Sequence, residues 1–200
     1  MKRALAALVL AVPASAPAAI LELHAAVRSG ASTGTGIGGA QKDADFFAAA
    51  RGATYGVLVG LEVMWIDISV AHDQFTDFST VTGTWTQVMA GPHFTFPLEE
   101  PKAGELPSTY ADLGVAAGFG VGTGQQVDPP LDNAQISDKG GLIELKVGIE
   151  KRLGKYVGLG ITAPLTWGYM FKNDVVNDVS NHYQTFHAMV LGTMTVRVGF

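Results

Sequence analysis

The chain has 200 residues, of which 48% are hydrophobic and only 16% are charged, and its net charge is −5 at pH 7. This length suits one domain with a sizeable core, and the acidic balance argues against nucleic-acid binding. There is no cysteine, which excludes disulfide scaffolds, zinc–thiolate sites and thiol catalysis. The 25 glycines are scattered through apolar segments, which excludes a collagen-like repeat.

The N-terminus, residues 1–18, has the three parts of a secretory signal peptide. Lys2 and Arg3 come first, an apolar run over residues 4–12 follows, and small residues come last. The apolar run is about half of the ~20 residues that a membrane-spanning helix needs. We therefore expect an exported chain whose first residues are removed.

Two cleavage points satisfy the preference for small residues before the cut. Cleavage after Ala18 is favoured over cleavage after Ala16, because the second would leave Pro17 directly after the cut. The mature domain would then be residues 19–200. Its longest uncharged stretch, residues 78–98, contains proline and many polar residues, unlike a helix that faces hydrocarbon.

The last segment, residues 186–200, alternates in polarity with a period of two. Its even-numbered residues are apolar or small, whereas the odd-numbered ones include His187 and Arg197. Successive side chains of a β-strand point to opposite faces, so this pattern predicts a strand with one uncharged, apolar face.

The same alternation recurs in seven earlier segments, which makes eight in total. The connections between them alternate between long and short, with residues 97–109 as a long exception on the short side, and the pattern is least regular around Pro92. An even number of alternating strands with this asymmetry predicts an all-β, eight-stranded, antiparallel up-and-down barrel. The seven segments are residues 21–28, 55–62, 66–73, 87–96, 112–121, 143–150 and 157–168.

Period two alone allows either a secreted lipocalin-like barrel or a transmembrane barrel. The mixed-polarity faces favour the second, because several consist mostly of glycine and alanine, which suit a narrow lumen better than a solvated surface. The charges on these faces can pair inside the lumen, as buried charges require. We expect a lumen charge network of Glu22, Arg28, Glu62, Asp67, Asp73, Asp112, Glu144, Lys146, Glu150 and Arg197.

Aromatic residues lie near the segment ends, where the interfacial girdles of a transmembrane barrel belong. A soluble barrel would more often bury them in its core. The expected girdle residues are Tyr55, Trp65, Trp85, Phe94, Phe96, Tyr110, Tyr156, Trp167, Tyr169, Tyr183 and Phe200.

With these features the mature chain resembles the small eight-stranded outer-membrane β-barrels of Gram-negative bacteria, such as the barrels of outer membrane protein A and outer membrane protein X. The most specific element of the resemblance is the terminal strand "MVLGTMTVRVGF". The resemblance implies that Met194, Val196, Val198 and Phe200 form a signal read by the outer-membrane assembly machinery. It also implies location in the outer membrane.

Three motifs resemble nucleotide-binding or catalytic sites, and each is interpreted as having no such function. "GTGIGG" (residues 34–39) matches a dinucleotide fingerprint but is expected in a loop of an all-β chain, with a short helix after it over residues 40–52. A lipid-modifying hydrolase would need a serine nucleophile and a histidine base in contact. Two loose clusters offer these groups, but their spacing looks coincidental, and we expect no enzyme: Asp178 with Ser180 and His182, and Ser69 with His72 and Asp73.

Metal binding is likewise not expected. His24, His93 and His187 are interpreted as hydrogen-bonded groups of the lumen rather than metal ligands. The loop carboxylates lack the spacing of a calcium motif and are interpreted as solvated charge: Asp132, Asp138, Asp174 and Asp178.

The sequence therefore predicts a monomeric outer-membrane barrel with a structural or surface-binding role through its external loops. Its partners would be outer-membrane lipid and the assembly machinery, with no cofactor and no nucleic acid. An eight-stranded barrel has an interior that side chains can fill. A narrow pore is the first alternative, because many inward positions are glycine, and the lipid-modifying hydrolase is the second.

Overall fold

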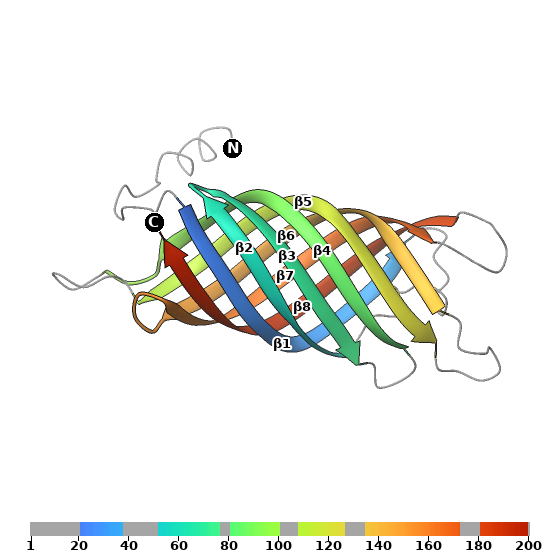
Figure 1. The fold of residues 1–200 in the computed structure, drawn as a ribbon, viewed down its shortest axis with the longest axis horizontal. Coiled ribbons are helices and arrows are strands. Elements are labelled where there is room, and N and C mark those ends of the chain that lie inside the picture. The colour runs from blue at the N-terminus through green and yellow to red at the C-terminus, as the bar shows by residue number, and fades with distance from the viewer. Residues whose placement is uncertain are drawn as a thin grey trace, which may run out of the picture.

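The computed structural model describes residues 21–37, 52–76, 81–100, 108–126, 135–172 and 181–199. They form eight antiparallel strands that close into a barrel in chain order, with β1 paired to both β2 and β8 (Figure 1). The predicted eight-stranded up-and-down barrel is confirmed. The strands are β1 (Leu21–Ile37), β2 (Gly52–Val63), β3 (Ile66–Thr76), β4 (Val81–Pro97), β5 (Thr109–Gln126), β6 (Gln135–Arg152), β7 (Val157–Lys172) and β8 (Asn181–Gly199).

The strands are strongly tilted, as Figure 1 shows and as the register requires. A circuit of directly opposed residues that starts at Leu23 returns to β1 at Thr35, twelve positions further along. This stagger is what closing a sheet into a barrel demands, and a larger stagger gives more tilt and a wider interior. The circuit passes through Leu61, Ile68, Ala90, Ala117, Ile143, Trp167 and Phe186.

The irregular fourth segment keeps its register through Pro92. Pairing with β5 stops after Ala90 and resumes at His93 opposite Gly114, with no residue gained or lost. Proline lacks the backbone N–H that a ladder needs, so the interruption follows directly from its chemistry. The backbone N–H of His93 instead donates to the carbonyl oxygen of Trp65 at 2.8 Å.

The barrel has two distinct ends. We call the end that holds the start of β1 and the finish of β8 the terminal end, and its connections are residues 64–65, 98–108 and 153–156. The opposite, loop end carries the connections 38–51, 77–80, 127–134 and 173–180. The 98–108 connection is long, as the sequence predicted, whereas the β3–β4 connection is short because both strands extend further than their apolar pattern does.

Strand extension also overturns two loop assignments. Residues 34–37 of "GTGIGG" belong to β1, where Gly34 is opposite His187 of β8, so a neighbouring strand orders this glycine-rich segment. Asp138, expected to be solvated, lies in β6 and is fully buried. The expected signal peptide, most of the helix expected over residues 40–52, and Phe200 lie outside the described residues.

The inward and outward faces follow the alternation predicted from the sequence. In β8, for example, His187 is 3% exposed whereas the adjacent Phe186 is 40% exposed. Large apolar side chains cover the outside of all eight strands. In the part of the chain that the structure describes, no helix is long and apolar enough to span a membrane.

Candidate functional site: the barrel lumen

A group of ion pairs lies in the lumen at the terminal end, centred on Arg197 of β8. Its guanidinium contacts Glu150 with both arms, Nη2 to Oε2 at 2.5 Å and Nε to Oε1 at 3.1 Å. Nη1 also donates to Glu22 Oε1 at 2.9 Å. Arg152 Nε lies 3.4 Å from the same Glu150 carboxylate. One largely buried guanidinium therefore joins carboxylates from β1 and β6.

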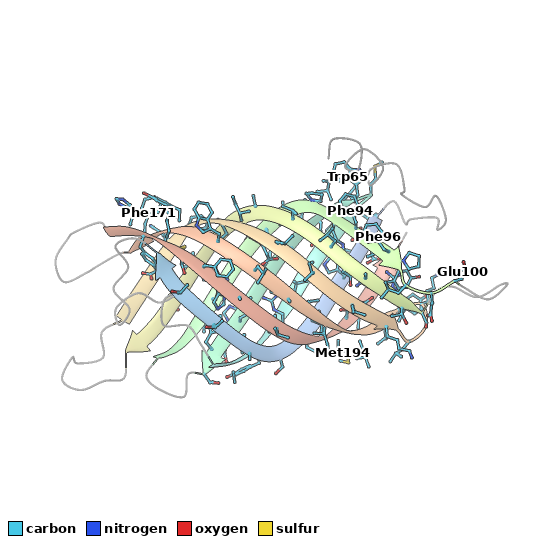
Figure 2. All side chains as sticks on the ribbon, turned by 180° about the vertical axis from the view of Figure 1, so that it is seen from behind. Trp65, Phe94, Phe96, Glu100, Phe171 and Met194 are labelled. Atoms are coloured by element: carbon cyan, nitrogen blue, oxygen red, sulfur yellow. The ribbon has the colours of Figure 1, made fainter. Side chains whose placement is uncertain are left out.

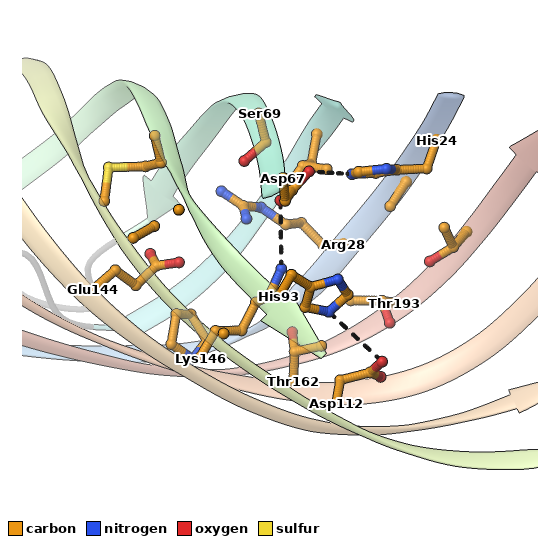
Figure 3. A pocket seen from close by; sticks show the side chains of 18 of the residues that line it. His24, Arg28, Asp67, Ser69, His93, Asp112, Glu144, Lys146, Thr162 and Thr193 are labelled. Atoms are coloured by element: carbon orange, nitrogen blue, oxygen red, sulfur yellow. Dashed lines mark ion pairs between the residues drawn. The ribbon is translucent and has the colours of Figure 1, made fainter. Parts of the chain in front are cut away.

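Two histidines lie close to this group, and each contacts at least one carboxylate. His93 Nδ1 is 2.9 Å from Glu62 Oε2, and its Nε2 is 3.7 Å from Asp112 Oδ1. His24 Nε2 is 3.4 Å from Asp67 Oδ1 (Figure 3). Lys146 approaches the other oxygen of Asp67 at 3.9 Å (Figure 3), which is too long for a hydrogen bond.

Further into the barrel, Arg28 of β1 forms a two-armed ion pair with Asp73 of β3. Nε lies 2.7 Å from Oδ1, and Nη2 contacts Oδ2. The residue between them, directly opposite both, is Gly56 of β2. A Cβ at Gly56 would lie 2.3 Å from Asp73 Oδ1, so the missing side chain leaves the space through which the pair meets.

The same device recurs at the terminal end of the lumen. Gly60 of β2 lies between His24 and Asp67, and a Cβ there would be 2.3 Å from His24 Nε2. Gly158 of β7 lies beside Glu150, and its Cβ would be 2.5 Å from the carboxyl carbon. Inward glycines therefore let long side chains on the two flanking strands meet across the strand between them.

Toward the loop end the lumen is filled by a cluster of buried apolar side chains, which we call the apolar plug. Trp85 is 2% exposed, and a Cβ on Gly120 would lie 2.3 Å from its ring and 2.8 Å from Leu142. The indole N–H donates to Gln87 Oε1 at 2.8 Å, so the ring is anchored as well as packed. The plug consists of Phe75, Trp85, Met89, Leu142, Met170, Tyr183, Met189 and Leu191.

Between the ion pairs and the plug there is a cavity of about 80 Å³. Its walls include Lys146 and the buried side chains of His24 and Asp112 (Figure 3). Two buried polar atoms of these side chains, His24 Nδ1 and Asp112 Oδ1, have no hydrogen-bond partner. Sites for drug-sized ligands are roughly 300–1,000 Å³, so the cavity suits a few water molecules.

All ten residues of the expected charge network lie on the inward face. Their partners could not be read from the sequence, and Glu144 shows why. It accepts hydrogen bonds from Gln87 at 3.3 Å and Thr166 at 3.4 Å, and the nearby Lys146 turns to Asp67 instead.

Sequence reasoning missed one inward carboxylate, Asp138, which accepts a hydrogen bond from the Tyr183 hydroxyl. Its even-numbered position, shared with Glu144 and Glu150 of the same strand, was the signal that could have placed it inside.

The aromatic girdle differs from the prediction at three of the described positions. Trp85 and Tyr183 are buried in the apolar plug, at 2% and 3% exposed, because they share the inward parity of Gln87 and His187. Tyr110 is half-buried, because it is directly opposite the inward Glu150 and its ring faces Arg152. The other described members are exposed: Tyr55, Trp65, Phe94, Phe96, Tyr156, Trp167 and Tyr169. Figure 2 shows Trp65, Phe94 and Phe96 at the terminal end, and Phe171, which was not among the predicted residues, at the loop end. Trp65 and Phe94 are stacked with ring centroids 6.4 Å apart.

The two clusters considered for hydrolase chemistry do not assemble in the described residues. Ser69 and Asp73 face the lumen, whereas His72 is exposed on the outer face and bonds Thr86 Oγ1 at 2.8 Å. His182 stacks on the outward Tyr169 at 5.5 Å. Asp178 and Ser180 lie outside the described residues.

The histidines of the lumen are likewise dispersed. His24 and His93 lie near the terminal end, while His187 contacts Phe75 of the plug with ring centroids 5.5 Å apart. Among the residues that the structure describes, no three His, Asp or Glu side chains are placed to hold a metal ion. Asp132, Asp174 and Asp178 fall outside them.

No protein-family model matches the chain, and no characterised protein matches it in sequence. Solved structures do match. Neisserial surface protein A is 12% identical with a TM-score of 0.52, and the match covers 90% of this chain and 97% of that one. The N-terminal β-barrel domain of Pseudomonas aeruginosa OprF is 11% identical with a TM-score of 0.50, covering 90% and 98%. At these identities the likeness concerns the fold alone. The chain has the fold of the small eight-stranded outer-membrane β-barrels.

Proposed function

We propose that this chain is a closed, monomeric β-barrel of the bacterial outer membrane, with a structural or surface-binding role exercised through the connections at its loop end. Two features of the barrel support the proposal. The first is an outer surface suited to lipid, and the second is a lumen that is filled.

The outer surface of β6 is bracketed by two exposed lysines, Lys139 near the loop end and Lys151 near the terminal end. The outward residues between them are one glycine and four aliphatic side chains, Gly141, Ile143, Leu145, Val147 and Ile149. Twelve residues at about 3.4 Å each, on a strand tilted by about 40°, span roughly 30 Å along the barrel axis. This matches the ~30 Å hydrocarbon core of a bilayer.

A continuous apolar belt of this kind is not expected on the surface of a soluble barrel. The outward aliphatic side chains are about half exposed, for example Ile161 at 61% and Val59 at 59%. Contiguous apolar surface on this scale marks contact with a membrane or a partner, since soluble monomers expose only small apolar patches. The lipocalin-like alternative would place these side chains in a core and the charges outside, which is the reverse of the arrangement here.

The main observation in favour of a closed lumen is the apolar plug. Its members come from β3, β4, β6, β7 and β8, and each is at most 4% exposed. Trp85 and Leu142 occupy the space over Gly120, one of the glycines that suggested a pore, and this supports a closed lumen. A narrow pore would require the plug to move.

The last strand supports a proposed encounter with the outer-membrane assembly machinery. Met194, Val196 and Val198 are each 39–48% exposed on the outer face of β8, where a receptor could contact them before the barrel closes. We expect removal of Phe200 to slow assembly more than it lowers the stability of the finished barrel. Normal insertion of the shortened chain in cells would contradict this role.

Membrane fractionation tests the location, and bilayer conductance tests the closed state. We expect the protein in the detergent-extracted outer-membrane fraction, with migration on a gel that changes on heating. Recovery from the soluble periplasm without detergent would overturn the proposal. Lipid A of unchanged mass in cells that overproduce the protein would separate the barrel from the hydrolase alternative.

A further inference from the structure

The turn between β6 and β7 gathers basic and aromatic side chains on the outside of the terminal end. Lys151 and Lys155 are exposed, and Leu153 and Tyr156 are 55% and 52% exposed. Lys155 Nζ lies 5.4 Å from the centre of the Tyr156 ring. We call these four residues the basic rim.

We propose that the basic rim binds the headgroups of anionic phospholipids at the edge of the membrane. This inference rests on the proposed membrane location and adds a lipid preference at one end of the barrel.

The position of the rim selects an amphipathic partner. Lys151 is directly opposite Leu159 of β7, and Ile149 and Leu159 are outward members of the apolar belt at 55% and 45% exposed. A ligand there therefore meets aliphatic side chains on one side and ammonium groups on the other. A phospholipid with a negative headgroup matches both, whereas a soluble anion would use only the charge.

The turn is held in place by the backbone, which lowers the ordering cost of binding. Arg152 N–H donates to Ser108 carbonyl oxygen at 2.6 Å, and Leu153 N–H donates to Val157 carbonyl oxygen at 2.7 Å. The Arg152 guanidinium lies 4.1 Å from the centre of the Tyr110 ring and also faces Glu150. Arg152 is thus engaged within the barrel, and among the described residues of this turn Lys151 and Lys155 are the exposed cations.

Carboxylates at this end are mostly turned away from the rim. Glu22, Glu62 and Glu150 face the lumen and are paired there. The exposed carboxylates among the described residues of this end are Glu99 and Glu100, and Figure 2 places Glu100 near the outermost point of the barrel end. Glu99 lies closer, because it accepts from Ser108, whose carbonyl oxygen accepts from Arg152 N–H, but its carboxylate is held by these bonds to Ser108. Most described carboxylates of this end therefore point into the lumen, whereas the two lysines lie beside the belt.

Lys139 provides a matched control, because it is an exposed outward lysine on the same strand at the opposite end of the belt. The full-length mature chain is refolded in nanodiscs of mixed phosphatidylcholine and phosphatidylglycerol. Native mass spectrometry then counts the lipids of each type that stay bound. The three proteins compared are the wild type, Lys151→Gln/Lys155→Gln, and Lys139→Gln.

We expect the wild type and Lys139→Gln to retain an excess of phosphatidylglycerol, and the double variant to lose most of it, with a weaker excess at high salt. Heat-dependent gel migration confirms that all three barrels are folded. An equal excess in all three, or none in the wild type, would overturn the lipid preference and leave the proposed function intact. Failure to enter a bilayer at all would overturn both.

Discussion

Arg197 of β8 and Glu150 of β6 form a two-armed ion pair across β7, with contacts of 2.5 and 3.1 Å. The pair can form because β7 presents glycine at this level. The side chains are 12% and 5% exposed, so both charges are largely removed from solvent. An ion pair of this kind makes strong demands on its geometry, since the attraction must offset the loss of hydration.

We predict that Arg197→Met lowers the free energy of unfolding by about 3–5 kcal/mol, because it leaves Glu150 with a buried, poorly compensated charge. The change is measured by urea titration of the barrel in lipid vesicles. Adding Glu150→Gln to Arg197→Met should recover part of the loss, giving a coupling of about 0.5–3 kcal/mol. Strict additivity of the two substitutions would contradict the pairing.

Gly158→Ala tests the space that the pair needs. The added Cβ would lie 2.5 Å from the Glu150 carboxyl carbon, so the carboxylate must move away from Arg197. We expect a loss of stability similar to that of Glu150→Gln. In a Glu150→Ala background the same methyl group meets no carboxylate and should cost little. A large cost in that background would show that the backbone, and not the ion pair, requires the glycine.

Two adjacent glycines of β6, on opposite faces of the strand, differ in the space available for a side chain. A Cβ on Gly140 would lie 2.0 Å from the Tyr169 carbonyl oxygen, whereas a Cβ on Gly141 meets nothing within 4 Å. We predict that Gly140→Ala abolishes assembly of the heat-modifiable form and that Gly141→Ala assembles normally. Equal behaviour of the two variants would mean that the inward and outward faces of β6 are misassigned.

The outer belt predicts a depth-dependent penalty for charge. Leu145 lies midway between the bracketing lysines of β6 and is 41% exposed. Leu145→Arg should lower the free energy of unfolding in vesicles by about 2–4 kcal/mol, the cost of arginine at a bilayer midplane. Lys139→Arg, at the edge of the belt, serves as the control and should be neutral. An equally small effect at both positions would argue against a lipid-facing belt.

Glu99, in the connection between β4 and β5 and outside the apolar belt, is expected to titrate at a lowered pH. Hydrogen bonds from the Ser108 hydroxyl and backbone N–H hold the pKa of the Glu99 carboxyl below its ordinary value. Their contribution is present at neutral pH and is lost as the pH falls through that lowered pKa. Ser108→Ala should therefore raise the pKa toward its ordinary value, as followed by NMR of the Glu99 carboxyl carbon. Identical titration curves would contradict these bonds.

The alternation in the sequence was sufficient to predict the barrel and the direction of most side chains. Val196 and Arg197 point to opposite faces because strand side chains alternate, and this needs only local information. Trp85 shows that residue type is a weaker guide than parity. Aromatic residues near strand ends are typical of a girdle, but Trp85 is buried because its odd-numbered position shares the inward parity of Gln87.

The contacts inside the lumen could not be predicted, since they depend on the register between strands. Arg28 meets Asp73 only because Gly56 is opposite both, and a shift of one residue would break the alignment. The stagger of twelve residues around the barrel is likewise a property of the closed sheet, which no single segment encodes.

The apolar plug is most directly probed through Trp85. Trp85→Ala removes the ring that covers Gly120, and we expect it to lower the free energy of unfolding by about 3–5 kcal/mol, as is usual when a large core aromatic is truncated. We also expect the vacated space to open the lumen toward the loop end, so this variant should show ion currents. A silent Trp85→Ala barrel would mean that other plug residues seal the lumen without it.

Single-channel recording of the wild-type barrel in planar bilayers tests the central claim, that the lumen is closed. Folded protein should give no stable current steps at neutral pH, under conditions in which Trp85→Ala inserted from the same detergent does. Stable, uniform steps from the wild type would contradict the closed barrel and establish the narrow pore instead.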